Sequence, residues 1–177
     1  SIIAACIIIY FVQVLLKEHN AFVFKYSFIT SRVAVVSEFY RFFTHMFLHG
    51  SFLHLAGNML FLWIFGDNVE DKFGKIKFIE FYVLGGITAA LTQSGISLIS
   101  GTENIPMIGA SGAISAVIGA YLIFFPKAKI LTFIPFIVIL VPAWLYIIIW
   151  FLIQLLSGFV NILNINIAYF AHIGGFV

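Results

Sequence analysis

Residues 109–125 read GASGAISAVIGAYLIFF, a run without a charged side chain and rich in small residues. The small residues recur at helical spacing, which places them on two adjoining stripes of a helix surface. The two stripes are Ser111, Ser115 and Gly119, and Gly112, Ala116 and Ala120. Because small side chains let membrane helices approach closely, this run predicts a membrane helix that packs tightly against a neighbour.

The whole chain has the composition of a membrane protein. Of its 177 residues, 63% are hydrophobic and only 9% are charged, whereas soluble domains carry about 25% charged residues. Lipid requires an apolar exterior with the backbone hydrogen bonds closed within each helix. The net charge of +2 is small and scattered, which excludes a nucleic-acid partner. The single cysteine, Cys6, permits no internal disulfide.

Long apolar runs bounded by polar or turn-forming residues predict an all-α protein with six membrane helices. Pro126, Pro135 and Pro142 interrupt the chain before the fifth run, so part of 130–140 is expected to be a span end or an interfacial loop. We treat residues 1–177 as one domain whose two ends look clipped. The predicted spans are approximately 1–16, 51–66, 78–100, 110–125, 140–158 and 168–177.

The loops between these spans alternate in charge. Lysines occur in the second and fourth loops, and the third and fifth have none. Basic loops favour the cytoplasmic side, so the second, fourth and sixth spans should start at the outer side. The first loop, about residues 17–50, is long and rich in aromatic residues, which favour the lipid headgroup zone. We expect this loop to lie partly in the interface. The lysines of the second and fourth loops are Lys72, Lys75, Lys77, Lys127 and Lys129.

Polar residues lie near the outer ends of three spans and therefore share a depth. His54 and Asn58 are four residues apart in the second span and share one helix face. Ser111 opens the fourth span, and His172 lies in the sixth. An unpaired polar side chain in hydrocarbon is costly, and such residues usually serve function. We expect these four side chains to meet.

This set of side chains fits nucleophilic catalysis. A serine hydroxyl such as that of Ser111 becomes reactive when a base removes its proton, and neutral histidine is the usual base near neutral pH. His172 can supply that base. Negative charge then develops on a carbonyl oxygen, and the side chains of His54 and Asn58 and the backbone amide of Ser111 are suitable donors.

Further motifs complete a pattern. Gly109-Ala110-Ser111-Gly112 and Ala171-His172-x-x-Gly175 accompany His54 and Asn58, and the first loop carries Tyr40-Arg41, His45 and His49. Over nearly its whole length the chain resembles the rhomboid family of intramembrane serine proteases, in its prokaryotic form. The usual Trp-Arg pair of the first loop is here Tyr40-Arg41, so only Arg41 carries over.

The resemblance implies a six-helix core with a Ser111 and His172 dyad that lacks a third acid. It also implies an oxyanion hole formed by His54, Asn58 and the Ser111 amide, with no cofactor. The implied substrates are single-pass transmembrane proteins, cut in or near the membrane segment at a site open to the outer side. The implied location is the cell membrane of a prokaryote, in contact with lipid. The supporting positions are Gly109, Gly112, His49, Arg41 and Gly175.

Two other functions stay open. A rhomboid-like pseudoprotease would bind unstable transmembrane helices without cutting them, and the presence of both Ser111 and His172 argues against it. A small channel or transporter with a polar cavity would move solutes, but no inverted repeat or pair of broken helices supports it.

Two further polar groups have simpler interpretations. His45, His49 and His54 suggest a metal site, but the chain has no His-Glu-x-x-His motif and almost no carboxylate in its spans, which disfavours a metal. The acidic segment 67–71, followed by lysines, reads as a solvated loop.

Overall fold

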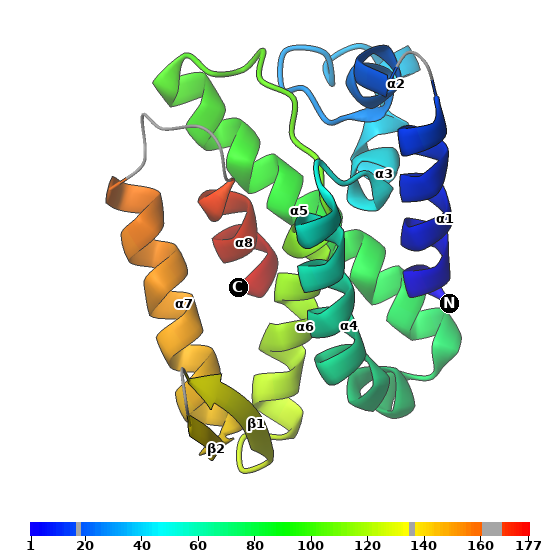
Figure 1. The fold of residues 1–177 in the computed structure, drawn as a ribbon. Helices are drawn as coiled ribbons and strands as arrows, with labels where there is room; N and C mark the ends of the chain where they lie inside the picture. Colours follow the sequence, from blue (N-terminus) through cyan, green and yellow to red (C-terminus); the bar gives the residue numbers. More distant parts are fainter. Residues whose placement is uncertain (17–18, 135–136, 161–167) are drawn as a thin grey trace.

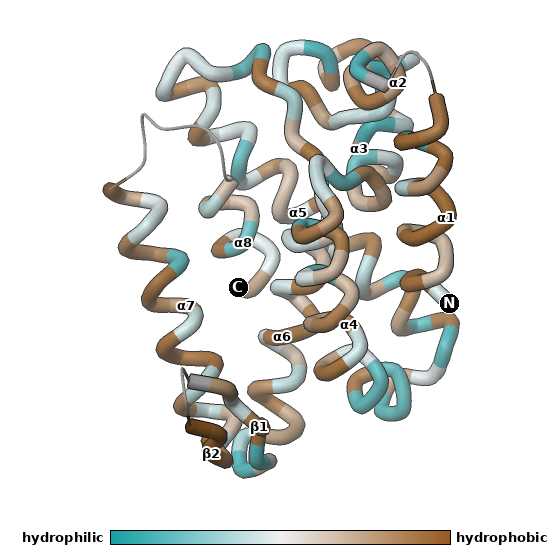
Figure 2. Tube along the Cα trace, viewed as in Figure 1, coloured by the Kyte–Doolittle hydropathy of each residue, from teal (hydrophilic) through white to brown (hydrophobic). Residues whose placement is uncertain are grey.

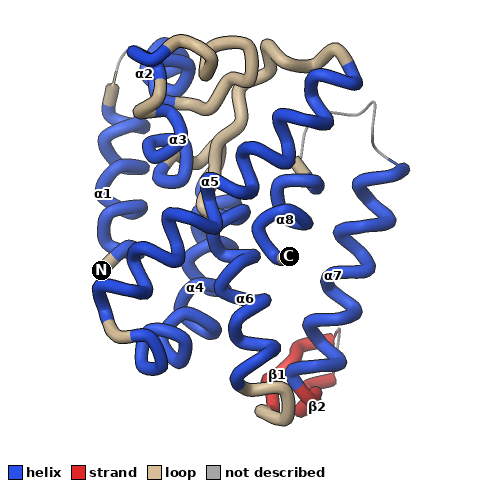
Figure 3. Tube along the Cα trace, turned by 180° about the vertical axis from the view of Figure 1, so that it is seen from behind, coloured by secondary structure: helices blue, strands red, loops and turns tan. Residues whose placement is uncertain are grey.

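A computed structural model describes residues 1–16, 19–134, 137–160 and 168–177, and most of them are helical (Figures 1 and 3). Two short 3-10 helices, η1 (Val36–Glu38) and η2 (His45–Phe47), lie in the first half of the chain. Two strands, β1 (Lys129–Ile134) and β2 (Ile137–Pro142), lie in the second half. The α-helices are α1 (Ile2–Leu15), α2 (His19–Tyr26), α3 (Arg41–Thr44), α4 (Phe52–Phe73), α5 (Lys75–Ser100), α6 (Ser111–Phe124), α7 (Ala143–Val160) and α8 (Tyr169–Phe176).

A helix lies in each of the six predicted apolar runs, but the helices differ in length. By length and composition, two described helices can cross a membrane, α5 and α7. A third span results if Val36–Phe47 and Phe52–Phe73, which meet at 82°, count as one bent unit. The apolar helices α1 and α6 have 14 residues each, or about 21 Å, against roughly 30 Å of hydrocarbon. The count of six spans therefore stays a prediction.

The acidic segment predicted to be a loop is helical. Asp67, Glu70 and Asp71 belong to α4, which continues to Phe73. The helix ends at Gly74, whose φ of 77° favours glycine, and α5 begins at the next residue. Asp67 and Asp71 are exposed, so the predicted solvation agrees with the structure and the predicted loop was wrong. A helix can run past its apolar part when its charged turns face solvent.

The segment predicted to be a span end or interfacial loop is a β-hairpin. β1 and β2 pair antiparallel, from Lys129 opposite Pro142 to Ile134 opposite Ile137; Pro135 lies outside the described residues. Rows of β-branched residues favour strands, and Pro142 occupies a strand end, where a missing N–H is tolerated. The protein is therefore mostly helical rather than all-α.

Helix α6 lies at the centre of the fold and packs against α4, α5 and α8. Every residue of α6 from Gly112 to Tyr121 is buried. Small residues on the neighbours make these contacts close: a Cβ added at Gly85 of α5 would overlap Ala116. One added at Gly119 would overlap the Phe176 carbonyl of α8. The small stripes of α6 thus pack against α8 and α5, which confirms the predicted close packing against a neighbour.

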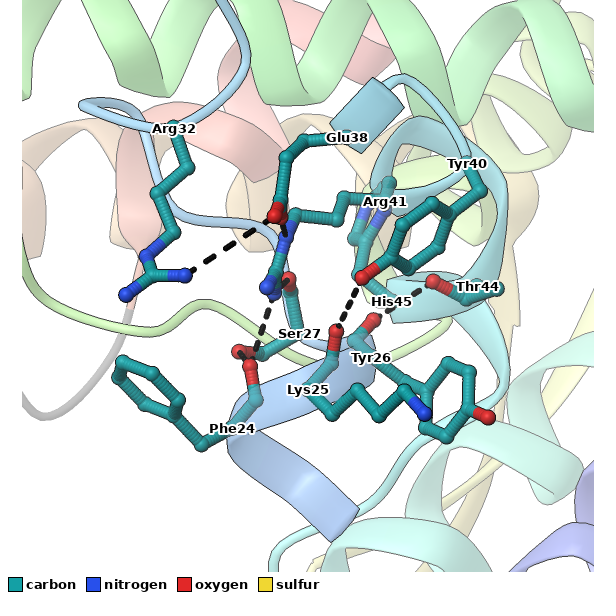
Figure 4. A network of polar contacts seen from close by, with 10 residues as sticks. All are labelled: Phe24, Lys25, Tyr26, Ser27, Arg32, Glu38, Tyr40, Arg41, Thr44 and His45. Atoms are coloured by element: carbon teal, nitrogen blue, oxygen red, sulfur yellow. Dashed lines mark hydrogen bonds and ion pairs between the residues drawn. The ribbon is translucent and has the colours of Figure 1, made fainter. Parts of the chain in front are cut away.

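The segment between α1 and α4 is organised around Arg41 (Figure 4). The Arg41 side chain is 2% exposed and donates hydrogen bonds to the carbonyls of Phe24, at 2.8 Å, and Ser27, at 2.7 Å. It also forms an ion pair with Glu38. Arg41 therefore holds short helices together and does not line the cavity described below.

Different elements lie at the two ends of the molecule. The α4–α5 turn and the β-hairpin lie at one end, and α2 and α3 lie at the other (Figure 1). Hydrophilic residues concentrate at both ends, whereas α1 and α7 are largely hydrophobic along their length (Figure 2). The two lysine-bearing connections predicted to share a side thus share an end of the molecule. The orientation of that end in a membrane stays a prediction.

Candidate active site

The predicted nucleophile and the predicted base are in direct contact. Ser111 is the first residue of α6, and its Oγ lies 2.7 Å from Nε2 of His172 in α8. Such a distance permits proton transfer between the two groups. The sequence suggested a common depth for these residues, and the structure supplies the distance.

Two glycines allow α6 to pack closely against α8 and α5. A Cβ added at Gly175 would overlap the carbonyl oxygen of Gly112, and one added at Gly112 would overlap Ala89 of α5. Gly112 follows Ser111 directly, and Gly175 lies one turn beyond His172. Gly175 therefore sets the separation of α6 and α8, which carry Ser111 and His172, and Gly112 sets the separation of α6 and α5.

The predicted oxyanion donors come from the first turns of α4. Ser51 caps this helix, and its side chain accepts a hydrogen bond from the His54 amide at 3.1 Å. Asn58 follows one turn later, is 8% exposed, and its Nδ2 has no hydrogen-bond partner among the described residues. His54 and Asn58 line the same cavity as Ser111 and His172. A buried amide donor is thus available at this wall.

Gly109 brings the His54 ring against the backbone that leads into α6. Its φ is 124°, and a Cβ there would lie 2.9 Å from both Cε1 and Nε2 of His54. The amide of Gly109 donates to the carbonyl of His45 at 2.9 Å. Gly109 therefore contacts the His45 carbonyl and the His54 ring, and it lies two residues before Ser111.

His49 packs behind His54. Its side chain is fully buried, and the two rings meet edge to face with centroids 5.2 Å apart. Gln13 of α1 holds the His49 backbone from both sides: its Nε2 donates to the His49 carbonyl at 3.1 Å, and its Oε1 accepts from the His49 amide at 3.2 Å. Among the described residues no group of three or more His, Cys, Asp or Glu side chains is placed to hold a metal.

The dyad opens onto a cavity of about 500 Å³. This volume lies within the range of about 300–1,000 Å³ that is common for ligand sites. The walls come from the helices α4 to α8, from His45 of η2 and from the segment just before α6. Apolar side chains form much of the lining, including those of Leu53, Phe61, Ile114, Ile118 and Trp150.

Gln154 of α7 is a site residue that the sequence did not single out. Its Oε1 lies 2.7 Å from Nδ1 of His172, on the side of the ring opposite to Ser111. The sequence does contain a feature that could have identified it, because Gln154 is an amide inside an 18-residue helix made almost entirely of apolar residues. Polar residues in membrane helices usually have a partner on a neighbouring helix.

Comparison with known proteins establishes the family. Residues 36–177 match the model of the Rhomboid domain. This chain belongs to the rhomboid family. Its rhomboid relatives include bacterial and mitochondrial proteins, and the chain spans less than half the length of each of the three named next.

The three rhomboid relatives have similar identities. Rhomboid protein 1, mitochondrial, of Saccharomyces cerevisiae is 31% identical over 61% of this chain and 30% of its own length. Rhomboid protease AarA of Providencia stuartii is 28% identical, over 70% of this chain and 49% of its own length. Rhomboid protease GlpG of Yersinia pestis is 30% identical, over 79% of this chain and 45% of its own length. The protein is thus a rhomboid family membrane protein.

Proposed function

We propose that the chain is an intramembrane serine endopeptidase with Ser111 as nucleophile and His172 as general base. The observation that carries the proposal is the 2.7 Å contact between Ser111 Oγ and His172 Nε2 at the wall of the cavity. Membership of a family with relatives named as rhomboid proteases supports the same reaction class.

The proposed reaction has two stages. Ser111 Oγ attacks the carbonyl carbon of the peptide bond while its proton passes to His172 Nε2. The tetrahedral intermediate collapses, the C–N bond breaks, and His172 returns the proton to the leaving amine. Water then attacks the carbonyl of the acyl-enzyme while His172 takes a proton from it. The ester bond to Ser111 breaks, His172 returns the proton to Ser111 Oγ, and the new carboxyl end is released.

Three donors would stabilise the oxyanion. The Ser111 amide belongs to the first turn of α6, where N–H groups lack intrahelical acceptors and the helix dipole favours negative charge. Asn58 Nδ2 supports this assignment, because a buried donor without a partner costs about 1–3 kcal/mol unless a ligand uses it. His54, held over Gly109, would be the third donor.

The proposed substrates are single-pass transmembrane proteins. The cavity lies between helices of a membrane protein and is largely apolar, which suits an unwound stretch of a substrate's membrane segment. Unwinding is needed because a helix engages its carbonyls in internal hydrogen bonds. We further propose that residues 1–177 form one domain, that the cavity opens to the outer side, and that the protein lies in a prokaryotic cell membrane.

The test uses purified protein in lipid vesicles with a transmembrane substrate and a fluorophosphonate probe. The natural protein should cleave the substrate and be labelled, Ser111→Ala should do neither, and His172→Ala should lose turnover. Ser100→Ala is the matched control, because Ser100 is the last residue of α5, its hydroxyl donates to the Ile96 carbonyl, and it does not line the cavity. Cleavage and labelling by Ser111→Ala would refute the assignment.

The same experiment separates the two other functions. A pseudoprotease would bind the substrate without cutting it and would not be labelled. A channel or transporter would pass solute into the vesicles equally well in the natural protein and in Ser111→Ala.

A further inference from the structure

Gln154 contacts the ring nitrogen of His172 that the dyad leaves free. The dyad uses Nε2, which lies 2.7 Å from Ser111 Oγ, and Gln154 Oε1 lies 2.7 Å from Nδ1. The imidazole is therefore held at both nitrogens, by α6 on one side and by α7 on the other.

These two contacts are compatible with one tautomer only. A neutral imidazole has one N–H and one bare nitrogen. An amide oxygen can accept a hydrogen bond but cannot donate one, so the proton must be on Nδ1. Nε2 is then bare and accepts from the Ser111 hydroxyl, which is the state that a general base needs.

The other groups around His172 offer no competing partner for Nδ1 among the described residues. From α4 the nearest titratable group is His54, and within α8 the Tyr169 ring lies 6.4 Å away, centroid to centroid. Where α5 packs against Gly112 and Gly174, its side chains are Ala89 and Thr92, neither of which is titratable.

We propose that Gln154 is a positioning residue that keeps His172 in the Nδ1–H tautomer with Nε2 directed at Ser111. This inference rests on the proposed protease function and adds to the dyad a residue that orients its histidine. A carboxylate in this place would also stabilise the imidazolium, but it would bring a charge into an apolar helix. A neutral amide orients the ring without that desolvation cost.

The kinetic test compares two substitutions at one position. Gln154→Met keeps the length of the side chain and removes the oxygen, and we expect kcat to fall about 10- to 100-fold, as for other residues that orient a functional histidine, with KM little changed. Gln154→Glu restores the acceptor and should recover much of kcat. Its negative charge favours the imidazolium, so the acidic limb of the kcat profile should move to higher pH.

The spectroscopic test does not depend on activity. In protein labelled with ¹⁵N-histidine, long-range ¹H–¹⁵N spectra distinguish a protonated Nδ1 from a protonated Nε2, and His172→Ala identifies the signal. We expect Nδ1–H in the natural protein and a substantial share of Nε2–H in Gln154→Met. Leu156→Met is the matched control, since Leu156 is 64% exposed on the same helix.

Two results would overturn the inference: an Nε2–H tautomer in the natural protein, or natural tautomer and kcat in Gln154→Met. Failure of the proposed function looks different. If Ser111→Ala cleaves normally, the protease assignment fails, and the spectra still test the Gln154 contact. If Ser111→Ala is inactive and Gln154→Met behaves as the natural protein, the positioning role alone fails.

Discussion

Gly109 shows how much depends on single residues in this site. Its backbone conformation lies in the region that favours glycine, and the His54 ring occupies the space where a side chain would begin. The same residue links to the His45 carbonyl. One hydrogen atom in place of a Cβ therefore lets the His54 ring, the proposed oxyanion donor, lie against the backbone segment that ends at Ser111.

We expect Gly109→Ala to displace His54 and lower kcat by about 10²- to 10³-fold, the usual effect of losing one oxyanion donor. The strained backbone should also cost about 1–3 kcal/mol of stability. Gly95→Ala is the control, because a Cβ there meets nothing within 4 Å. Steady-state cleavage and thermal unfolding measure the two effects, and unchanged kcat in Gly109→Ala would contradict the placement of His54.

Asn58 should separate activity from stability. Its Nδ2 is buried and has no hydrogen-bond partner within the described part of the chain, so Asn58→Leu removes an unsatisfied donor and should leave the free energy of unfolding unchanged or raise it by about 1 kcal/mol. The kcat should fall about 10²-fold or more. A substantial loss of stability would show that the Asn58 amide serves the fold and not the oxyanion.

Among the elements, the contact between α6 and α8 places the dyad. The two helices touch backbone to backbone at Gly112 and Gly175, and nucleophile and base lie next to that contact. Gly175→Ala should push α8 away from α6, separate Ser111 from His172, and abolish probe labelling. Overpacking of this kind should also cost about 1–3 kcal/mol. Normal labelling of a folded Gly175→Ala protein would contradict this account.

Arg41 acts at the scale of the segment between α1 and α4. Arg41→Lys keeps the charge but loses the planar guanidinium group that donates to the carbonyls of Phe24 and Ser27. Hydrogen bonds to charged groups contribute about 1.5–3 kcal/mol each, so we expect lower thermal stability and faster proteolysis between α2 and α3. The ion pair with Glu38 adds less, because the Glu38 side chain is 24% exposed.

For the whole molecule, the decisive question is which end faces outward. Cys6 is the single cysteine and is fully buried, so cysteines introduced at the surface can be labelled against a low background. We expect Lys75→Cys and Lys129→Cys to react with an impermeant maleimide from the cytoplasmic side, and Ser31→Cys from the outer side. Labelling of all three from one side would contradict the predicted orientation.

The sequence predicted which polar side chains would meet better than it predicted the elements around them. Ser111, His172, His54 and Asn58 stand out because polar residues are rare in apolar runs, and the structure brings these four residues to one cavity. Gln154 was not predicted, because a single amide side chain belongs to no sequence motif. Whether it can reach His172 depends on which face of α7 packs against α8. The hairpin was missed because an apolar, β-branched run resembles the end of a span.

Helix α7 contributes both to the cavity wall and to the contact with His172. It forms one wall of the cavity through Trp150, and one turn later Gln154 holds His172. An outward movement of α7 that widened the cavity would therefore also stretch the contact between Gln154 and His172. If the proposed base depends on that contact, the site would be least reactive while the cavity is widest.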